Sequence, residues 1–209
     1  MRITKFGHAC VRLETGDHTI VLDPGVFTEP EAVDGVAAVL VTHEHADHLA
    51  VERLRRADAP VFAGEGVAAA LREQAPDLAE RLQVVRAGDE LTAAGMRVTV
   101  HGEQHAQIHE DIPLIMNTGF CIEDQVFHPG DSFTAPPQPV PFLLVPVDAP
   151  WMRLAEAIDY ARAYASEQAV AMHDGLLNDN GHAVTGRIMG GLLDAHKVRL
   201  RQLGTGDDV

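Results

Sequence analysis

The sequence predicts an α+β protein of two similar halves, each contributing a β-sheet with helices on its outer side. Both halves begin with a β-rich stretch and continue with alternating strands and helices. The 209 residues, 46% apolar and 22% charged, suit one globular domain with one buried core. We therefore expect a single domain over residues 1–203 and a frayed C-terminal tail over residues 204–209.

The first half is expected to form short strands and two helices. Alternation of apolar residues and turn signals predict strands at 2–6, 9–14, 18–23, 37–42 and 60–63. The run over 37–42 is continuously apolar, which is typical of a strand covered on both faces. One helix is expected from near His48 to before Pro60, and a second over residues 67–73.

The second half repeats this order after a more extended section. Strands are predicted at 82–86, 96–101, 117–123, 125–128, 142–147 and 169–172. Helices are predicted over residues 151–164 and about 184–196. The proline-rich segment 135–141 is expected to be a surface connection, because proline lacks the N–H that a helix interior or a central strand requires.

Charge and cysteine content disfavour several classes of function. With 16 basic and 31 acidic residues the formal charge is −15, so we expect a small-molecule substrate and no nucleic-acid partner. The chain has no apolar run of membrane-helix length and no signal-peptide pattern at its start, so we expect a cytoplasmic protein without a membrane partner. Cys10 and Cys121 fit no disulfide framework and no Cys-x-x-Cys site.

A dense group of metal-ligand residue types follows the strand predicted at 37–42. His43, His45, Asp47 and His48 are spaced by 2, 2 and 1 residues. Side chains two apart on a strand point the same way, so the first two histidines can hold one ion while the next two residues reach toward a second. Imidazoles and carboxylates together suit zinc and similar divalent cations. The pattern predicts a metal site; the alternative is a solvent-exposed polar loop.

The stretch His43-Glu44-His45-Ala46-Asp47-His48 resembles the His-x-His-x-Asp-His signature of the metallo-β-lactamase superfamily of metal-dependent hydrolases. The resemblance implies a four-layer αβ/βα sandwich with a two-metal site at one edge of its two sheets. A compact branch that includes ascorbate-6-phosphate lactonase is similar in the segments Gly7-His8-Ala9, Leu22-Asp23-Pro24, His128-x-Gly130-Asp131-Ser132 and Met172-His173-x-Gly175. Pro129 departs from this branch, in which small residues are usual at that position. The superfamily resemblance also implies three further ligands downstream.

The first downstream ligand is expected to be a histidine on a loop after a strand. His105 fits this place, but His101 and His109 lie four residues to either side, and a helix would put all three on one face. The strand-forming residues 98–100, followed by Gly102, argue against that helix. We choose His105, although ligand chemistry does not separate the three histidines.

The other two downstream ligands are expected to be a bridging aspartate and a late histidine. Asp131 follows a predicted strand, and its two carboxylate oxygens can hold two cations; the alternative is an ordinary Pro-Gly-Asp turn. His173 follows the strand predicted at 169–172, and His182 and His196 are the alternatives.

The resemblance implies a division of these residues between two cations. One ion would be bound by His43, His45 and His105, the other by Asp47, His48 and His173, with Asp131 as the bridge. Zinc is the expected metal, with manganese or iron as alternatives. A metal-bound hydroxide would attack a small ester, lactone or phosphodiester, and Asp47 would be the catalytic residue that orients this nucleophile.

Other residues are candidates for supporting roles. Asp23 is expected either to accept a hydrogen bond from a ligand imidazole or to serve only as a strand-end turn residue. Trp151 and Tyr160 lie in a predicted helix and are expected to pack. Candidates for substrate contact, each with a solvated or packed histidine as the alternative, are His8, His109, His128 and His182.

Three other functions are compatible with the sequence. An iron-dependent oxidoreductase could use the same scaffold, although His45 in place of a carboxylate favours hydrolysis. A metal-dependent nuclease is disfavoured by the acidic charge and by the lack of a long insertion that could clamp nucleic acid. The third is a metal-holding protein without catalysis, since one fold can host many functions.

Overall fold

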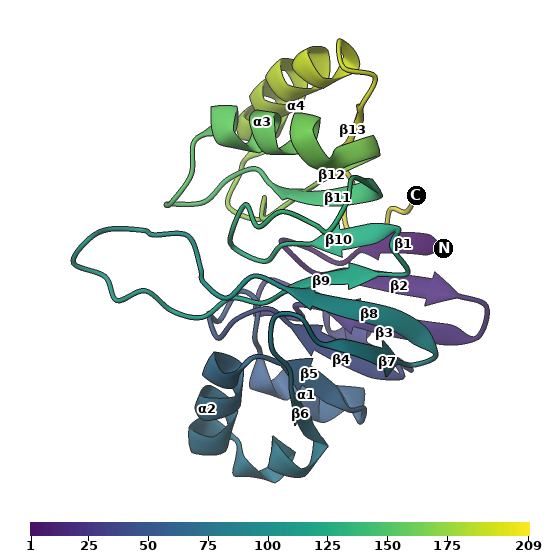
Figure 1. The fold of residues 1–209 in the computed structure, drawn as a ribbon, viewed down its shortest axis with the longest axis vertical. Helices are drawn as coiled ribbons and strands as arrows, with labels where there is room; N and C mark the ends of the chain where they lie inside the picture. Colours follow the sequence, from purple (N-terminus) through teal and green to yellow (C-terminus); the bar gives the residue numbers. More distant parts are fainter.

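The computed structural model describes residues 1–209 and arranges them in four layers, with two sheets face to face and helices outside each sheet (Figure 1). The first sheet contains, in spatial order, β1 (Arg2–Lys5), β2 (Val11–Thr15), β3 (His18–Leu22), β4 (Ala38–Val41), β5 (Val61–Ala63) and β6 (Leu82–Val84). The helices of this half are α1 (Val51–Ala57) and α2 (Glu65–Gln74), with 3₁₀ turns η1 (Pro30–Val33) and η2 (Pro76–Arg81).

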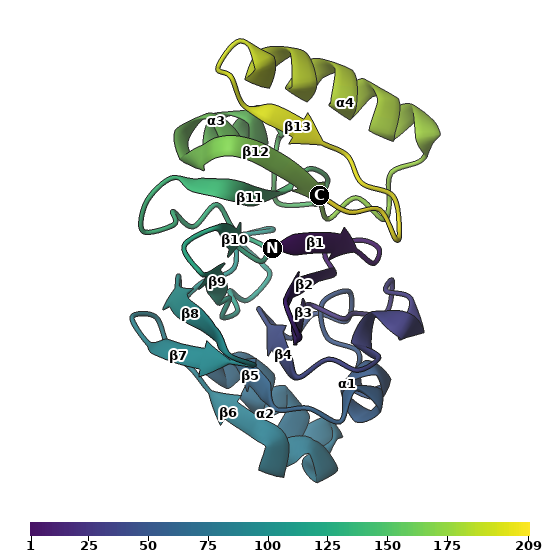
Figure 2. The same cartoon turned by 90° about the vertical axis from the view of Figure 1, so that its right-hand side faces the viewer.

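The second sheet is formed by the rest of the chain. Its spatial order is β13 (Arg199–Arg201), β12 (Ala165–Met172), β11 (Val140–Pro146), β10 (Val126–His128), β9 (Gly119–Ile122), β8 (Met96–His101) and β7 (Glu90–Ala93). Helices α3 (Leu154–Tyr164) and α4 (Asp179–Asp194) lie on its outer side, opposite to α1 and α2 (Figure 2). None of the helices combines the length and the hydropathy needed to cross a membrane.

Three apolar clusters hold the layers together. Leu40 of β4 and Phe120 of β9 belong to the cluster between the two sheets. Val39 of β4 packs with Leu54 of α1 on the outer face of the first sheet. Strand β4 is therefore buried on both faces, as its continuous apolar run predicts. An equivalent outer cluster joins the second sheet to α3 and α4. The predicted four-layer αβ/βα sandwich is confirmed.

Parallel pairing directs several strand ends toward one edge of the sandwich. Strands β3, β4, β5 and β6 are parallel, and so are β10, β11, β12 and β13. The carboxyl ends of parallel strands in one sheet lie at the same edge, where loops carry functional side chains. The segments that follow β4, β10 and β12 carry His43, Asp131 and His173 to this edge.

Two strands and the start of one helix differ from the sequence prediction. Strands β7 and β13 are not predicted; both are short edge strands, so they carry little apolar alternation. Helix α4 begins at Asp179 rather than near residue 184, with the Asn178 side chain accepting a hydrogen bond from Gly181 N–H. The glycines of this helix weaken its sequence signal.

The proline-rich segment and the following helix also need correction. Val140 and Pro141, expected in a surface connection, open the central strand β11. The register with β12 shifts between Val140 and Phe142, so Pro141 lies at an irregularity where the missing N–H is tolerated. Helix α3 begins at Leu154, and Trp151 lies in the preceding turn rather than in the helix.

The C-terminal tail is not frayed. Ile3 and Val209 exchange two backbone hydrogen bonds of 3.0 and 3.1 Å, and Gly206 N–H donates to the Lys5 carbonyl at 2.8 Å. The chain ends therefore lie side by side (Figures 1 and 2). The sequence gives no sign of this pairing because the tail is polar and glycine-containing, and its partner is almost the whole chain length away.

Candidate metal centre

The seven predicted ligands lie together at the edge where the strands end. Four of them lie in the segment that follows β4: His43, His45, Asp47 and His48. His105 comes from the long loop between β8 and β9, while Asp131 and His173 follow β10 and β12. All but two are buried: His45 and Asp47 are half-buried. Both halves of the chain therefore contribute to one site.

The ligand atoms of these residues fall into three overlapping groups. The first contains His43, His45 and His105, the second His8, Asp47, His48 and His173, and the third His43, His48 and Asp131; within each group the atoms lie within 4.8 Å of one another. The first two groups match the predicted division between two cations, except that the second also includes His8. The third group shares His43 with the first and His48 with the second, and adds Asp131, the predicted bridge.

Hydrogen bonds hold four of the ligand imidazoles in one tautomer. Each of these rings donates its Nδ1–H to an oxygen and leaves Nε2 as the free ligand atom. The pairs are His43 with Thr42 Oγ1 (3.0 Å), His48 with Asp23 Oδ2 (2.7 Å), His105 with the Ala106 carbonyl (2.6 Å) and His173 with the Asp148 carbonyl (2.6 Å). His45 instead presents Nδ1, which lies 3.1 Å from Nε2 of His43.

Several of the free ligand atoms have no hydrogen-bond partner despite their burial. They are Nε2 of His48, Nε2 of His105, Nε2 of His173 and Oδ1 of Asp131. A buried polar atom without a partner costs free energy, and native proteins rarely leave several of them together. Divalent cations would satisfy all four at once, so the residues present fit a metal centre.

Asp23 accepts a hydrogen bond from a ligand imidazole, which is one of the two roles predicted for it. Its Oδ1 accepts the Thr42 backbone N–H at 2.8 Å, and its Oδ2 accepts Thr42 Oγ1–H and His48 Nδ1–H at 2.7 Å each. Thr42 Oγ1 in turn accepts from His43, so one fully buried carboxylate orients two ligand rings. Sequence reasoning missed Thr42 because a threonine at a strand end has no specific signal.

His8 is a hydrogen-bond donor to Asp47 in this structure. The Gly175 backbone N–H donates to His8 Nδ1 at 3.1 Å, which places the imidazole proton on Nε2. That nitrogen lies 3.1 Å from Oδ2 of Asp47. Burial lowers the pKa of His8, which keeps the ring neutral. With one nitrogen accepting and the other protonated, neither is free to bind a cation.

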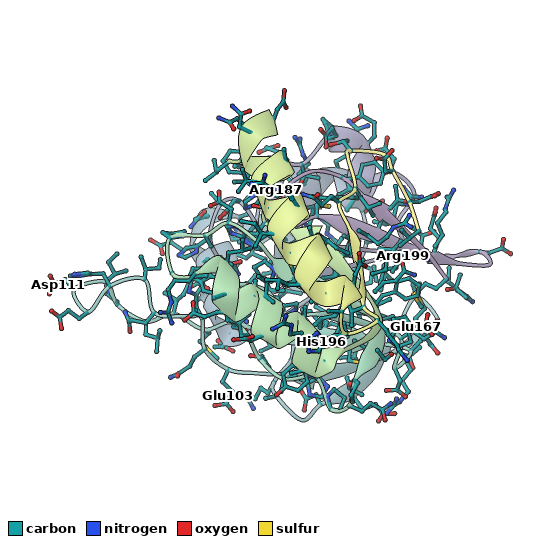
Figure 3. All side chains as sticks on the ribbon, turned by 90° about the horizontal axis from the view of Figure 1, so that it is seen from above. Glu103, Asp111, Glu167, Arg187, His196 and Arg199 are labelled. Atoms are coloured by element: carbon teal, nitrogen blue, oxygen red, sulfur yellow. The ribbon has the colours of Figure 1, made fainter.

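Of the three histidines spaced by four residues, only His105 reaches the site. His101 ends β8 and pairs with Thr99 Oγ1 at 2.8 Å, while His109 is exposed on the projecting loop. Figure 3 shows how far this loop extends from the body, with Asp111 at its tip.

The remaining histidines lie outside the ligand set. His128 is fully buried. Its ring donates to the Ala9 carbonyl at 3.0 Å and accepts from Gly130 N–H, so it holds two backbone segments together and does not face a substrate. His182 is partly exposed, with Nδ1 3.9 Å from Asp174. His196 lies past the end of α4 on the outer side of the protein (Figure 3).

Trp151 contacts the site, although its sequence position suggested packing alone. Its indole N–H donates to Oδ2 of Asp131 at 3.0 Å. Its ring stands edge-on to His105, with the centroids 6.2 Å apart. The sequence contained one usable signal: Trp151 comes soon after a strand whose end lies at the ligand-bearing edge.

Charges within the site are strongly coupled. Burial opposes protonation of His48, but the carboxylates of Asp131 and Asp23 outweigh it and hold the His48 pKa well above its usual range. Burial likewise opposes protonation of His173, but the carboxylates of Asp131 and Asp47, 3.0 and 3.4 Å from its Nε2, raise its pKa to about 9. In the metal-free protein, protons thus occupy positions that cations would take.

The two catalytic-type carboxylates stay ionised. Burial favours protonation of Asp47, but the nearby ring of His173 and the hydrogen bond from His8 hold its pKa below the usual range. For Asp131 burial acts in the same direction and is outweighed by the charge of His48, with the nearby rings of His105 and His173 adding to the effect and holding the Asp131 pKa well below its usual range. Both groups are therefore available as anionic ligands.

Comparison with known proteins places this fold and site in a family. A family model described as beta-lactamase superfamily domain matches residues 2–173. Protein Rv0786c of Mycobacterium tuberculosis is 36% identical over 193 residues, which cover 88% of this chain and 89% of that protein. The UPF0173 metal-dependent hydrolase MJ1163 of Methanocaldococcus jannaschii is 31% identical over 139 residues, covering 62% of this chain and 60% of that protein.

The structural comparison agrees. Igni18, a metallo hydrolase from the archaeon Ignicoccus hospitalis, superposes with a TM-score of 0.76 at 20% identity, covering 100% of this chain and 97% of Igni18. At 20% identity this superposition shows a shared fold only. The family model matches most of the chain and shows which family it belongs to. The protein belongs to the beta-lactamase superfamily.

Proposed function

We propose that the protein is a binuclear metal-dependent hydrolase of a small ester, lactone or phosphodiester. The observation that carries the proposal is the third ligand group, in which Asp131 lies near His43 of one set and His48 of the other. A relative named as a metal-dependent hydrolase supports the reaction class. The histidine-rich donor set favours zinc, with manganese or iron as the alternatives.

Bound divalent cations supply an activated water and polarise the oxygen of the scissile bond. The protein's own contribution centres on Asp47. Its side chain is 26% exposed, whereas the side chains of His48 and Asp131 are 0% and 4% exposed, so it is the more accessible of these groups to water and substrate. Because it stays ionised, Asp47 accepts a hydrogen bond from the attacking water and orients it.

The surroundings favour a substrate with an apolar part. A small hollow beside His45 and His105 is lined by Ile108, Ile112 and Leu114 of the projecting loop. Ile112 and Leu114 are both 44% exposed, which is high for side chains of this kind. An apolar group of the substrate would cover them while the reacting bond lies at the metal centre.

Metal quantification followed by an activity screen tests the proposal. Protein purified without added metal is analysed for bound ions, and then assayed with esters, lactones and phosphodiesters after loading with the ion found. The double variant His43→Ala, His45→Ala should lose one ion and all turnover, whereas His196→Ala, on the outer side of the protein, should match the wild type in both.

Each alternative function predicts a different result. Stoichiometric iron with oxygen-dependent turnover would identify an oxidoreductase and contradict the hydrolase. Tight RNA binding that weakens steeply with salt would support a nuclease. A loaded protein that leaves the whole panel unchanged would point to metal holding without catalysis. Two ions retained in the His43→Ala, His45→Ala variant would refute the ligand assignment.

A further inference from the structure

Trp151 is the protein's one tryptophan, and it lies in the turn between β11 and α3. Its indole N–H donates to Oδ2 of Asp131 across 3.0 Å. Its ring also stands edge-on to Phe133 at 5.1 Å and to His105 at 6.2 Å. The indole thus contacts Asp131 and His105, two of the residues assigned as metal ligands. The three residues lie in three different loops.

The two oxygens of Asp131 have different surroundings. Oδ2 accepts the indole N–H and lies 3.0 Å from Nε2 of His173 and 3.5 Å from Nε2 of His105. Oδ1 is buried without a hydrogen-bond partner and lies 3.1 Å from Nε2 of His48. The backbone of Asp131 is fixed separately, because its N–H donates to the Asn117 side chain at 3.0 Å. The indole therefore restrains rotation of the Asp131 carboxylate about the Cβ–Cγ bond.

An indole suits this task for chemical reasons. It has a single donor and no acceptor, so it can bind a carboxylate oxygen but cannot itself bind a cation. It is neutral and does not titrate, so it fixes Asp131 without adding charge to a crowded site. A lysine or arginine in its place would compete with the cations for the carboxylate.

We propose that Trp151 is a positioning residue of the metal centre: by donating to Oδ2 of Asp131 it fixes the orientation in which both carboxylate oxygens face the ligand nitrogens. This inference rests on the proposed function only in taking Asp131 as a ligand. It implies that the two oxygens of the bridging carboxylate are not equivalent. It also implies that the single indole senses whether cations are bound.

The test uses the full-length protein and zinc, with two independent readouts. In the ¹H–¹⁵N spectrum of the metal-free wild type, the indole gives one resonance, which should shift on addition of Zn²⁺ until metal uptake is complete. In Trp151→Phe, which keeps an aromatic ring but lacks the N–H, zinc affinity should fall about 10- to 100-fold. Phe133→Leu alters the packing around the indole, leaves its N–H and should keep wild-type zinc affinity.

The outcomes separate this inference from the proposed function. Wild-type protein that binds two zinc ions, with Trp151→Phe binding them equally tightly, would overturn the positioning role and leave the metal centre intact. An indole resonance unmoved at saturating Zn²⁺ would do the same without relying on the fold of a variant. Equal losses of zinc affinity in Trp151→Phe and Phe133→Leu would show that Trp151 contributes only by packing and would overturn the positioning role. Wild-type protein that binds no zinc would overturn both proposals.

Discussion

His48 donates its Nδ1–H to Oδ2 of Asp23 across 2.7 Å, and both side chains are fully buried. Asp23 follows β3 and His48 lies in the loop after β4, so this bond ties the ends of two neighbouring parallel strands to each other. The same carboxylate accepts two hydrogen bonds from Thr42. Strand-end geometry and ligand orientation therefore depend on one residue.

Asp23→Ala is expected to weaken both the fold and metal binding. Removal of this buried acceptor leaves His48 and Thr42 without partners, which should cost about 3–5 kcal/mol of unfolding free energy. Zinc affinity should also fall by about 10- to 100-fold, because the His48 ring is no longer held. Urea unfolding and zinc competition measure the two effects. Asp17→Asn, in an exposed turn, is the control. Unchanged zinc affinity in Asp23→Ala would show that the bond does not orient the ligand.

His8→Ala should reduce turnover while leaving two ions bound. Loss of the donor frees Asp47 to rotate, so kcat is expected to fall about 10- to 100-fold. His8→Gln, which retains an N–H donor, should recover part of the loss. His182→Ala is the matched control, since this histidine lines the same hollow as His8 and is not bonded to a ligand. Loss of one ion in His8→Ala would instead make His8 a ligand.

The sequence could predict those parts of the site that depend on neighbours along the chain. The proposed ligands from His43 to His48 follow one buried strand, so their local spacing was sufficient to predict that they lie close together. His105 required the end of β8 to be located, and the strand-forming residues before it allowed that. By contrast, the contact between Trp151 and Asp131 joins two loops 20 residues apart and depends on the packing of α3. The carbonyl acceptors of Ala106 and Asp148 could not be predicted, because backbone groups carry no residue-type signal.

Metal affinity should rise with pH. The pKa of His173 is raised from 6.5 to about 9, so its proton stabilises the metal-free fold fully below pH 6.5, and this stabilisation is lost as the pH rises through 9. A cation must displace that proton, and that of His48 as well. Binding at pH 7 should therefore release about two protons per chain. Calorimetry in buffers of different ionisation enthalpy measures the release; none at pH 7 would contradict these protonation states.

The buried pair between Lys5 and Asp174 should matter for stability. Lys5 lies on β1 of the first sheet and Asp174 follows β12 of the second, with side chains 3% and 7% exposed. Lys5→Met leaves the Asp174 carboxylate unpaired and should cost about 3–5 kcal/mol in urea unfolding. Adding Asp174→Leu should restore much of this loss, whereas Arg187→Met on exposed α4 should have little effect. A single variant as stable as the wild type would mean that Asp174 finds another partner.

The projecting loop should determine substrate affinity rather than reaction rate. Leu114 is 44% exposed beside the hollow at His45 and His105, so its contact with an apolar substrate group forms on binding and persists in the transition state. Leu114→Asn should raise KM about tenfold with kcat unchanged, because such an interaction contributes equally to both states. Ile188→Asn changes a 40% exposed apolar side chain on α4, away from the site, and should leave both constants unaltered. A fall in kcat at constant KM in Leu114→Asn would show instead that the loop acts on the chemical step.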